Sequence, residues 1–189
     1  MDKLKQRILA EGNVATGGIL RVDSFLNHQV DVLFLQEIAT EFKQYFAAQS
    51  ITKVLTVEAS GITVAAFVAL QLEVPLLFAK KTAAGNMDDD NYQAPVFSYT
   101  RGMDYNIRVS SRYLNADDRV LIIDDFLAMG SAVDGLCEIV RASGAELVGV
   151  GIVIEKGFQP GGKELRARGI DVCSLVIVDE LGDGEIKFR

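Results

Sequence analysis

The sequence predicts an α/β fold, namely a doubly wound, mostly parallel sheet with helices on both faces. Short apolar runs alternate with helical patterns along most of the chain, which is the order that βαβ units produce. The run RVLIID at 119–124 is almost continuously apolar, as in a strand covered on both faces. The length of 189 residues and the hydrophobic content of 49% suit one domain, 1–189, with a large core.

The N-terminal part predicts two helices joined by an irregular segment. Leu4, Ile8 and Leu9 lie on one face of a first helix. A glycine-containing loop and the segment ILRVDSFLNHQV (19–30) follow. A longer helix is expected roughly from Val32 to Gln49, with an inward face formed by Leu35, Ile38, Phe42 and Phe46.

Strands and helices then alternate. Strands are expected at KVLTVEASG (53–61), PLLFA (75–79), RVLIID (119–124), ELVGVGIVIEK (146–156) and VCSLVIV (172–178). Helices are expected at ITVAAFVALQL (62–72), at about 130–142 before Gly144, and at KELRARG (163–169).

The segment 82–111 breaks this alternation. Polar residues, Gly85, Gly102 and the acidic run 88–90 replace clean periodicity. We interpret it as a long flexible loop, with at most a weak hairpin around NIRVSS (106–111). A loop of this length in a compact domain is often a lid, and a surface flap without function is the alternative.

Composition excludes several classes of function. The formal net charge of −7 weighs against a nucleic-acid partner. Two distant cysteines and one histidine indicate neither a zinc site nor a Ser-His-Asp triad. The start MDKLKQRILAEG lacks the apolar run of a signal peptide, and no stretch approaches a membrane span. We therefore expect a cytoplasmic protein without a membrane partner.

The most informative stretch is VLIIDDFLAMGSA, residues 120–132. An apolar strand ends in the carboxylates of Asp124 and Asp125, and a turn of small residues opens the next helix. Ligands of open α/β sheets bind beyond the carboxyl ends of strands, and a helix N-terminus holds phosphate through its unpaired N–H groups. Adjacent carboxylates accept hydrogen bonds from a vicinal diol. A diol and a phosphate at this separation indicate a phosphorylated ribose, although two capping acids on a core strand are the simpler alternative.

At these residues the chain resembles the type I phosphoribosyltransferases, whose signature for 5-phosphoribosyl 1-pyrophosphate (PRPP) is a hydrophobic run, two acids and a small-residue loop. The resemblance implies that Asp124 and Asp125 hold the ribose hydroxyls. It implies that the 5-phosphate lies in the loop formed by Ala128, Met129, Gly130, Ser131 and Ala132. Met129 and Ala132 replace threonines that are usual in the family, so two hydroxyl donors are lost.

The resemblance extends over nearly the whole chain and is nearest to the bacterial members that use xanthine. It rests on GGILRVDSFLNHQVD (17–31), VEASGI (57–62), FAKK (78–81) and GIVIEKGFQPGG (151–162). The implied reaction transfers the phosphoribosyl group of PRPP to xanthine, in purine salvage. The resemblance also implies a homodimer and Mg²⁺ carried with PRPP, so no dedicated protein metal site is expected.

Cations and N–H donors are required at the leaving pyrophosphate, where negative charge grows. Lys80 and Lys81 follow a predicted strand directly, and Ala59 and Ser60 form a small turn after another. These four residues are the candidates for binding pyrophosphate, and the two lysines are candidates for catalysis together with Asp124 and Asp125. A lysine pair on a surface turn is often only solvated, which is the alternative for Lys80 and Lys81.

The base pocket is expected at the ends of 146–156 and of the N-terminal segment. Lys156 can donate to O6 of a 6-oxopurine, and Phe158 can stack on its ring or belong to the core. By resemblance, residues 1–30 form a hood over the base, in which Leu20 supplies an apolar wall. The amide of Asn27 suits the C2 carbonyl of xanthine. Ala128 stands where an acid is expected in hypoxanthine-guanine enzymes.

Two other functions stay open at this point. The first is the same reaction with guanine or hypoxanthine; Lys156 argues against adenine. The second is a regulator that senses PRPP without catalysis. A purine repressor of that kind needs a DNA-reading domain ahead of the ligand domain, and the few residues before the predicted core are not notably basic.

Overall fold

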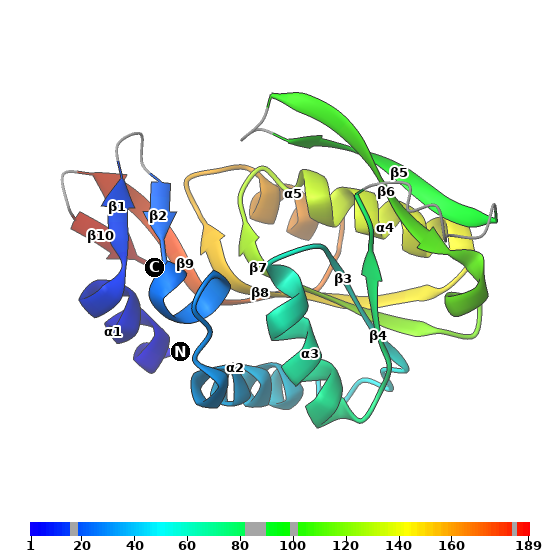
Figure 1. The fold of residues 1–189 in the computed structure, drawn as a ribbon, viewed down its shortest axis with the longest axis horizontal. Helices are drawn as coiled ribbons and strands as arrows, with labels where there is room; N and C mark the ends of the chain where they lie inside the picture. Colours follow the sequence, from blue (N-terminus) through cyan, green and yellow to red (C-terminus); the bar gives the residue numbers. More distant parts are fainter. Residues whose placement is uncertain (16–18, 82–89, 99–101, 183–184) are drawn as a thin grey trace.

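The computed structural model describes residues 1–15, 19–81, 90–98, 102–182 and 185–189. A six-stranded sheet with strand order β10-β9-β8-β7-β3-β4 forms its centre (Figure 1). Its strands are β3 (Lys53–Val57), β4 (Leu76–Ala79), β7 (Arg119–Leu127), β8 (Glu146–Lys156), β9 (Val172–Gly182) and β10 (Glu185–Phe188). Neighbouring strands are parallel except β10, which pairs antiparallel with β9. The predicted doubly wound α/β fold is confirmed.

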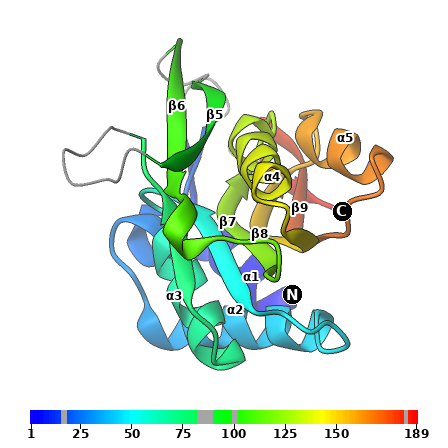
Figure 2. The ribbon, with the colours of Figure 1, turned by 90° about the vertical axis from the view of Figure 1, so that its right-hand side faces the viewer.

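Helices cover both faces of this sheet (Figures 1 and 2). The helices α2 (Val32–Tyr45) and α3 (Gly61–Leu72) lie on one face, whereas α4 (Ser131–Ser143) and α5 (Gly161–Ala167) lie on the other. Continuous apolar strands such as β7 are therefore buried from both sides. The expected helix 32–49 ends four residues early, at Tyr45, where the N–H of Phe46 bonds to the carbonyls of Gln44 and Phe42.

The strand order reverses between β3 and β7. From β3 the chain runs through α3 to β4 at one edge of the sheet, and from β7 it runs through α4 and α5 toward β9 and β10. The carboxyl ends of β3 and β7 lie side by side at this reversal, which is where open α/β sheets bind their ligands.

The hairpin expected around 106–111 is present, and it is much longer than the interpretation of 82–111 as a flexible loop allowed. β5 (Asn91–Ser98) and β6 (Met103–Ser110) form an eight-residue antiparallel hairpin, which stands beside α4 in Figure 2. Ala94, Val96, Ile107 and Val109 are buried and pack on the α4 side of the sheet. A Cβ atom on Gly135 of α4 would lie 2.7 Å from Val96 Cγ2. Residues 82–89 and 99–101 of the predicted loop lie outside the described residues.

The N-terminal segment forms a small unit at one end of the sheet. It contains α1 (Asp2–Glu11), the hairpin β1 (Asn13–Ala15) and β2 (Ile19–Arg21), and a π-helical turn, Asp23–Asn27. The Arg7 guanidinium lies 4.9 Å from the ring centroids of Phe25 and Phe34 and bonds to Asp31, which caps α2 through the N–H of Phe34. These contacts anchor the turn to the first long helix.

Candidate functional site

Two adjacent carboxylates lie at the carboxyl end of β7. Asp124 and Asp125 are only 7% and 6% exposed, and the backbone N–H of Asp125 donates to Asp124 Oδ1 at 3.0 Å. Burial, and then the neighbouring charge of Asp125, raises the pKa of Asp124 well above its ordinary value, and Lys81 partly opposes this shift. A buried acceptor pair of this kind is suited to bind hydroxyl donors of a ligand.

The turn 128–132 opens α4 next to these carboxylates. Gly130 has a φ of 92°, a left-handed conformation that favours glycine. The N–H of Asp134 bonds to the Gly130 carbonyl, while Gly161 donates to the Ala128 carbonyl at 3.1 Å. A Cβ atom on Gly130 would lie 3.2 Å from Gly161 Cα. Close packing against α5 thus fixes the turn, and the first turn of α4 leaves N–H groups available to an anion.

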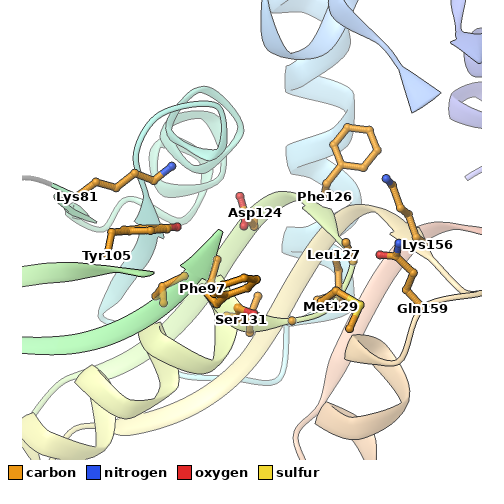
Figure 3. A pocket seen from close by; sticks show the side chains of 15 residues that line it. Lys81, Phe97, Tyr105, Asp124, Phe126, Leu127, Met129, Ser131, Lys156 and Gln159 are labelled. Atoms are coloured by element: carbon orange, nitrogen blue, oxygen red, sulfur yellow. The ribbon is translucent and has the colours of Figure 1, made fainter. Parts of the chain in front are cut away.

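A pocket of about 420 Å³ joins Asp124, the first of the two carboxylates, to the turn. The side chains around it come from β7, α4, the hairpin and the end of β8 (Figure 3). Its lining includes the whole of 128–132 and Asp124. The structure therefore brings the two halves of the predicted ribose-phosphate motif together.

Lys81 reaches this pocket and Lys80 does not line it. The Lys81 ammonium lies 5.6 Å from the Tyr105 ring centroid, and Figure 3 shows both side chains on the same side of Asp124. Lys80 is held by backbone hydrogen bonds of 2.9 Å in both directions with Arg108.

The predicted turn with Ala59 and Ser60 follows β3, and its Glu58–Ala59 peptide bond is cis. Glu58 accepts a hydrogen bond from the N–H of Lys81, which ties the turn to this lysine.

The opposite side of the pocket carries Lys156, Phe126 and Gln159 (Figure 3). Lys156 ends β8 and is half-buried, and desolvation lowers its pKa. Phe158 is 47% exposed and is not among the residues that line this pocket. Sequence reasoning missed Phe126 and Gln159. Strand alternation was the available signal for Phe126. It lies two residues after Asp124 on β7, and side chains two residues apart on a strand share a face.

Asn27 of the N-terminal unit reaches the acid pair. Its side-chain amide donates to Asp125 Oδ2 at 3.2 Å, which connects the expected hood to the expected ribose site. Leu20 is buried in the core and does not line the pocket. The roles predicted for Leu20 and Phe158 therefore have no support from the pocket, whereas Asn27 and Lys156 lie at the site or beside it.

Comparison with known proteins identifies the class. The phosphoribosyl transferase domain family matches residues 22–180, and the chain belongs to this family. Among curated relatives, xanthine phosphoribosyltransferases of Ruminiclostridium cellulolyticum and Clostridium novyi are 54% and 52% identical. The alignments cover all of this chain and 99% and 100% of those proteins.

Solved structures show the same fold at low sequence identity. An adenine phosphoribosyltransferase from Trypanosoma brucei has a TM-score of 0.79 at 19% identity, covering 95% of this chain and 81% of that one. The adenine phosphoribosyltransferase from Giardia lamblia has a TM-score of 0.77 at 21% identity, covering 94% of this chain and 98% of that one.

Within the described ranges, none of the helices is both long and apolar enough to cross a membrane.

Proposed function

We infer that this protein is a xanthine phosphoribosyltransferase, which converts xanthine and PRPP to xanthosine 5-phosphate and pyrophosphate. The observation that carries this proposal is one pocket in which the buried carboxylate of Asp124, the N-terminus of α4 and Lys156 converge. The substrate assignment is supported by full-length identities of 54% and 52% to enzymes named for xanthine.

In the proposed complex, the carboxylates of Asp124 and Asp125 accept hydrogen bonds from the ribose hydroxyls. The turn 128–132 and the dipole of α4 hold the 5-phosphate. Met129 and Ala132 offer no side-chain hydroxyl, so backbone N–H groups and Ser131 carry most of this binding. The rigid contact of the turn with Gly161 keeps those donors in place without a change of conformation.

The reaction forms a bond from a purine nitrogen to C1 of the ribose and breaks the bond from C1 to pyrophosphate. Negative charge grows on the leaving group, so donors must face it. Lys81 is the best supported cation, because it lines the pocket and lies close to the turn with Ala59 and Ser60. Lys80, which does not line the pocket, stays a prediction from the sequence. The nucleophilic nitrogen loses its proton, and Ala128 supplies no base there, so we propose that the acidity of xanthine itself helps this step.

Mg²⁺ would accompany PRPP. The paired carboxylates Asp124 and Asp125 present hard oxygen atoms of the kind that this ion binds. When bound, the ion would neutralise charge on the pyrophosphate oxygens. We propose that substrate oxygens supply most of its ligands.

On the base side, the ammonium of Lys156 donates to O6 and an aromatic ring stacks on the purine. Phe126 is better supported for stacking than Phe158, because only Phe126 lines the pocket. The proposed role of Asn27 at the C2 carbonyl is supported by its position next to Asp125, where base and ribose would meet. The apolar wall proposed for Leu20 stays a prediction.

Product formation with PRPP, Mg²⁺ and each of xanthine, guanine, hypoxanthine and adenine tests the proposal. A clear preference for xanthine is the expected result. Preferred turnover of guanine or hypoxanthine would keep the ribose and phosphate site but overturn the base assignment. Tight PRPP binding without turnover of any base would favour a PRPP-sensing regulator.

We also propose a cytoplasmic homodimer. Support for dimerisation comes from apolar side chains left exposed near the edge strand β4, where Leu70 of α3 is 67% exposed and Phe78 is 38% exposed. Sedimentation equilibrium at micromolar concentration tests the dimer, and a mass of 20.6 kDa, that of one chain, would contradict it. The cytoplasmic location stays a prediction from the sequence.

A further inference from the structure

Gln159 carries an unexplained polar group in the pocket. Its side-chain oxygen is buried and has no hydrogen-bond partner, a property that only the hydroxyl of Thr56 shares among the side chains that the structure describes. Gln159 also lines the pocket with Lys156 and Met129. Buried acceptors are almost always paired, so an unpaired one on a residue that lines a ligand pocket points to a donor on the ligand.

The backbone around Gln159 is fixed on both sides. Its N–H donates to the Lys156 carbonyl at 2.9 Å, and the N–H of Gly161 donates to the Ala128 carbonyl at 3.1 Å. A Cβ atom on Gly161 would lie 2.5 Å from that carbonyl oxygen, so the two segments are in direct contact. Pro160 between them restricts the chain further. Gln159 is therefore held at a constant place between the lysine and the phosphate turn.

The side chain points toward the proposed base position. Figure 3 shows its amide next to Lys156 and close to Met129, and all three residues line the pocket. If Lys156 donates to O6, the purine atoms that follow along the same edge are N1–H and C2. In xanthine these present a donor and then a carbonyl acceptor. A carboxamide presents the complementary acceptor and donor.

We propose that Gln159 reads this edge of the base: its Oε1 accepts from N1–H and its Nε2 donates to the C2 oxygen of xanthine. This inference deepens the proposed function and rests on it. The unpaired oxygen would then gain its partner only when the base binds. Gln159 is thus a specificity-determining residue that acts together with Lys156.

The pairing separates xanthine from the other 6-oxopurines. Hypoxanthine keeps N1–H but has no C2 oxygen, so it forms only one of the two hydrogen bonds. Guanine carries an amino group at C2, which would face the amide Nε2 donor to donor. A polar site rejects an analogue strongly when binding leaves its own groups unpaired.

Two variants test this reading. Gln159→Leu removes both polar atoms at similar size, and we expect kcat/KM for xanthine to fall about 10- to 100-fold. Hypoxanthine should lose less, because it loses one hydrogen bond rather than two. Gln159→Glu replaces the donor by a second acceptor, which suits N1–H and the amino group of guanine. We expect the guanine-to-xanthine ratio of kcat/KM to rise about 100-fold.

The matched control is Gln49→Leu, the same substitution on the exposed segment after α2. KM for PRPP and the melting temperature of each variant show whether the fold and the phosphate site are retained. Equal losses of kcat/KM for xanthine, hypoxanthine and guanine in both variants would assign Gln159 a purely structural role and overturn this inference. In that case a wild-type preference for xanthine would still leave the proposed function intact. A wild-type enzyme that does not use xanthine would overturn both.

Discussion

The substitution Gly61→Ala tests whether catalysis depends on the position of the Asp124 carboxylate. Gly61 begins α3 at the reversal point of the sheet, directly across from the end of β7. A Cβ atom there would lie 2.5 Å from Asp124 Oδ1 and 2.5 Å from the hydroxyl oxygen of Thr56. Ordinary carbon–oxygen contacts are about 3.3 Å or longer. In Gly61→Ala, the carboxylate must therefore move by about 1 Å.

The magnitude follows from this displacement. Misplacing a binding group by about 1 Å costs on the order of 100-fold in rate, or about 2.7 kcal/mol of transition-state stabilisation. Stability should change much less. Alanine is favoured over glycine in a helix by about 0.5–1 kcal/mol, which offsets part of a crowding cost of about 1–3 kcal/mol. A net loss of about 1 kcal/mol lowers the melting temperature by about 2–4 °C.

Initial rates at varied PRPP and saturating xanthine measure the effect. We expect kcat/KM for PRPP to fall about 100-fold in Gly61→Ala, with a folded protein by circular dichroism. Gly182→Ala is the matched control, because a Cβ atom at Gly182 has no heavy atom within 4 Å. A Gly61→Ala enzyme that keeps PRPP kinetics close to those of the wild type would refute the requirement for this carboxylate position.

Three further predictions concern charged groups. Lys156→Ala should lower kcat/KM for xanthine about 10- to 100-fold and leave KM for PRPP nearly unchanged, as steady-state kinetics can show. Asp124→Asn should raise the melting temperature at pH 7 while it abolishes most PRPP turnover, because burial that raises the pKa of Asp124 disfavours its charged form in the folded state. Glu155 is 3% exposed and forms two hydrogen bonds with Arg166, which lower its pKa against the opposing effect of burial. Glu155→Gln should therefore cost about 2 kcal/mol at pH 7. Urea titrations should show this difference in unfolding free energy shrinking as the pH falls below 4.5, the ordinary pKa, and then through the lowered pKa of the folded state. A difference independent of pH would contradict this account.

The parts of the site that follow a buried strand could be predicted from the sequence. The apolar run of β7 is followed by Asp124 and Asp125, and β8 ends at Lys156, so each candidate residue is placed by a local pattern. The carboxyl ends of parallel strands share one edge of the sheet. Local patterns and this one rule are enough to bring the acid pair, the phosphate turn and Lys156 together.

Features that depend on contacts distant in sequence could not be predicted in the same way. The hairpin of β5 and β6 carries Pro95 and Asn106 in a polar stretch, and its buried residues are recognisable only once α4 covers them. The strands β1, β2 and β10 are at most four residues long, too short for a periodic signal. Phe126 lies near the end of β7 and Phe158 follows β8 closely, and only the three-dimensional structure distinguishes the pocket residue from the exposed one.

The hydrogen bond between Asn27 and Asp125 shows how one such distant contact completes the site. The two residues are 98 positions apart, and the turn that carries Asn27 is positioned by the buried side chains of Phe25 and Leu26 and by Arg7. An amide nitrogen has two hydrogens and its oxygen accepts. Asn27 can therefore keep its bond to Asp125 and still present a donor and an acceptor to a base. In the proposed complex, the N-terminal unit would thus contact both the ribose and the base.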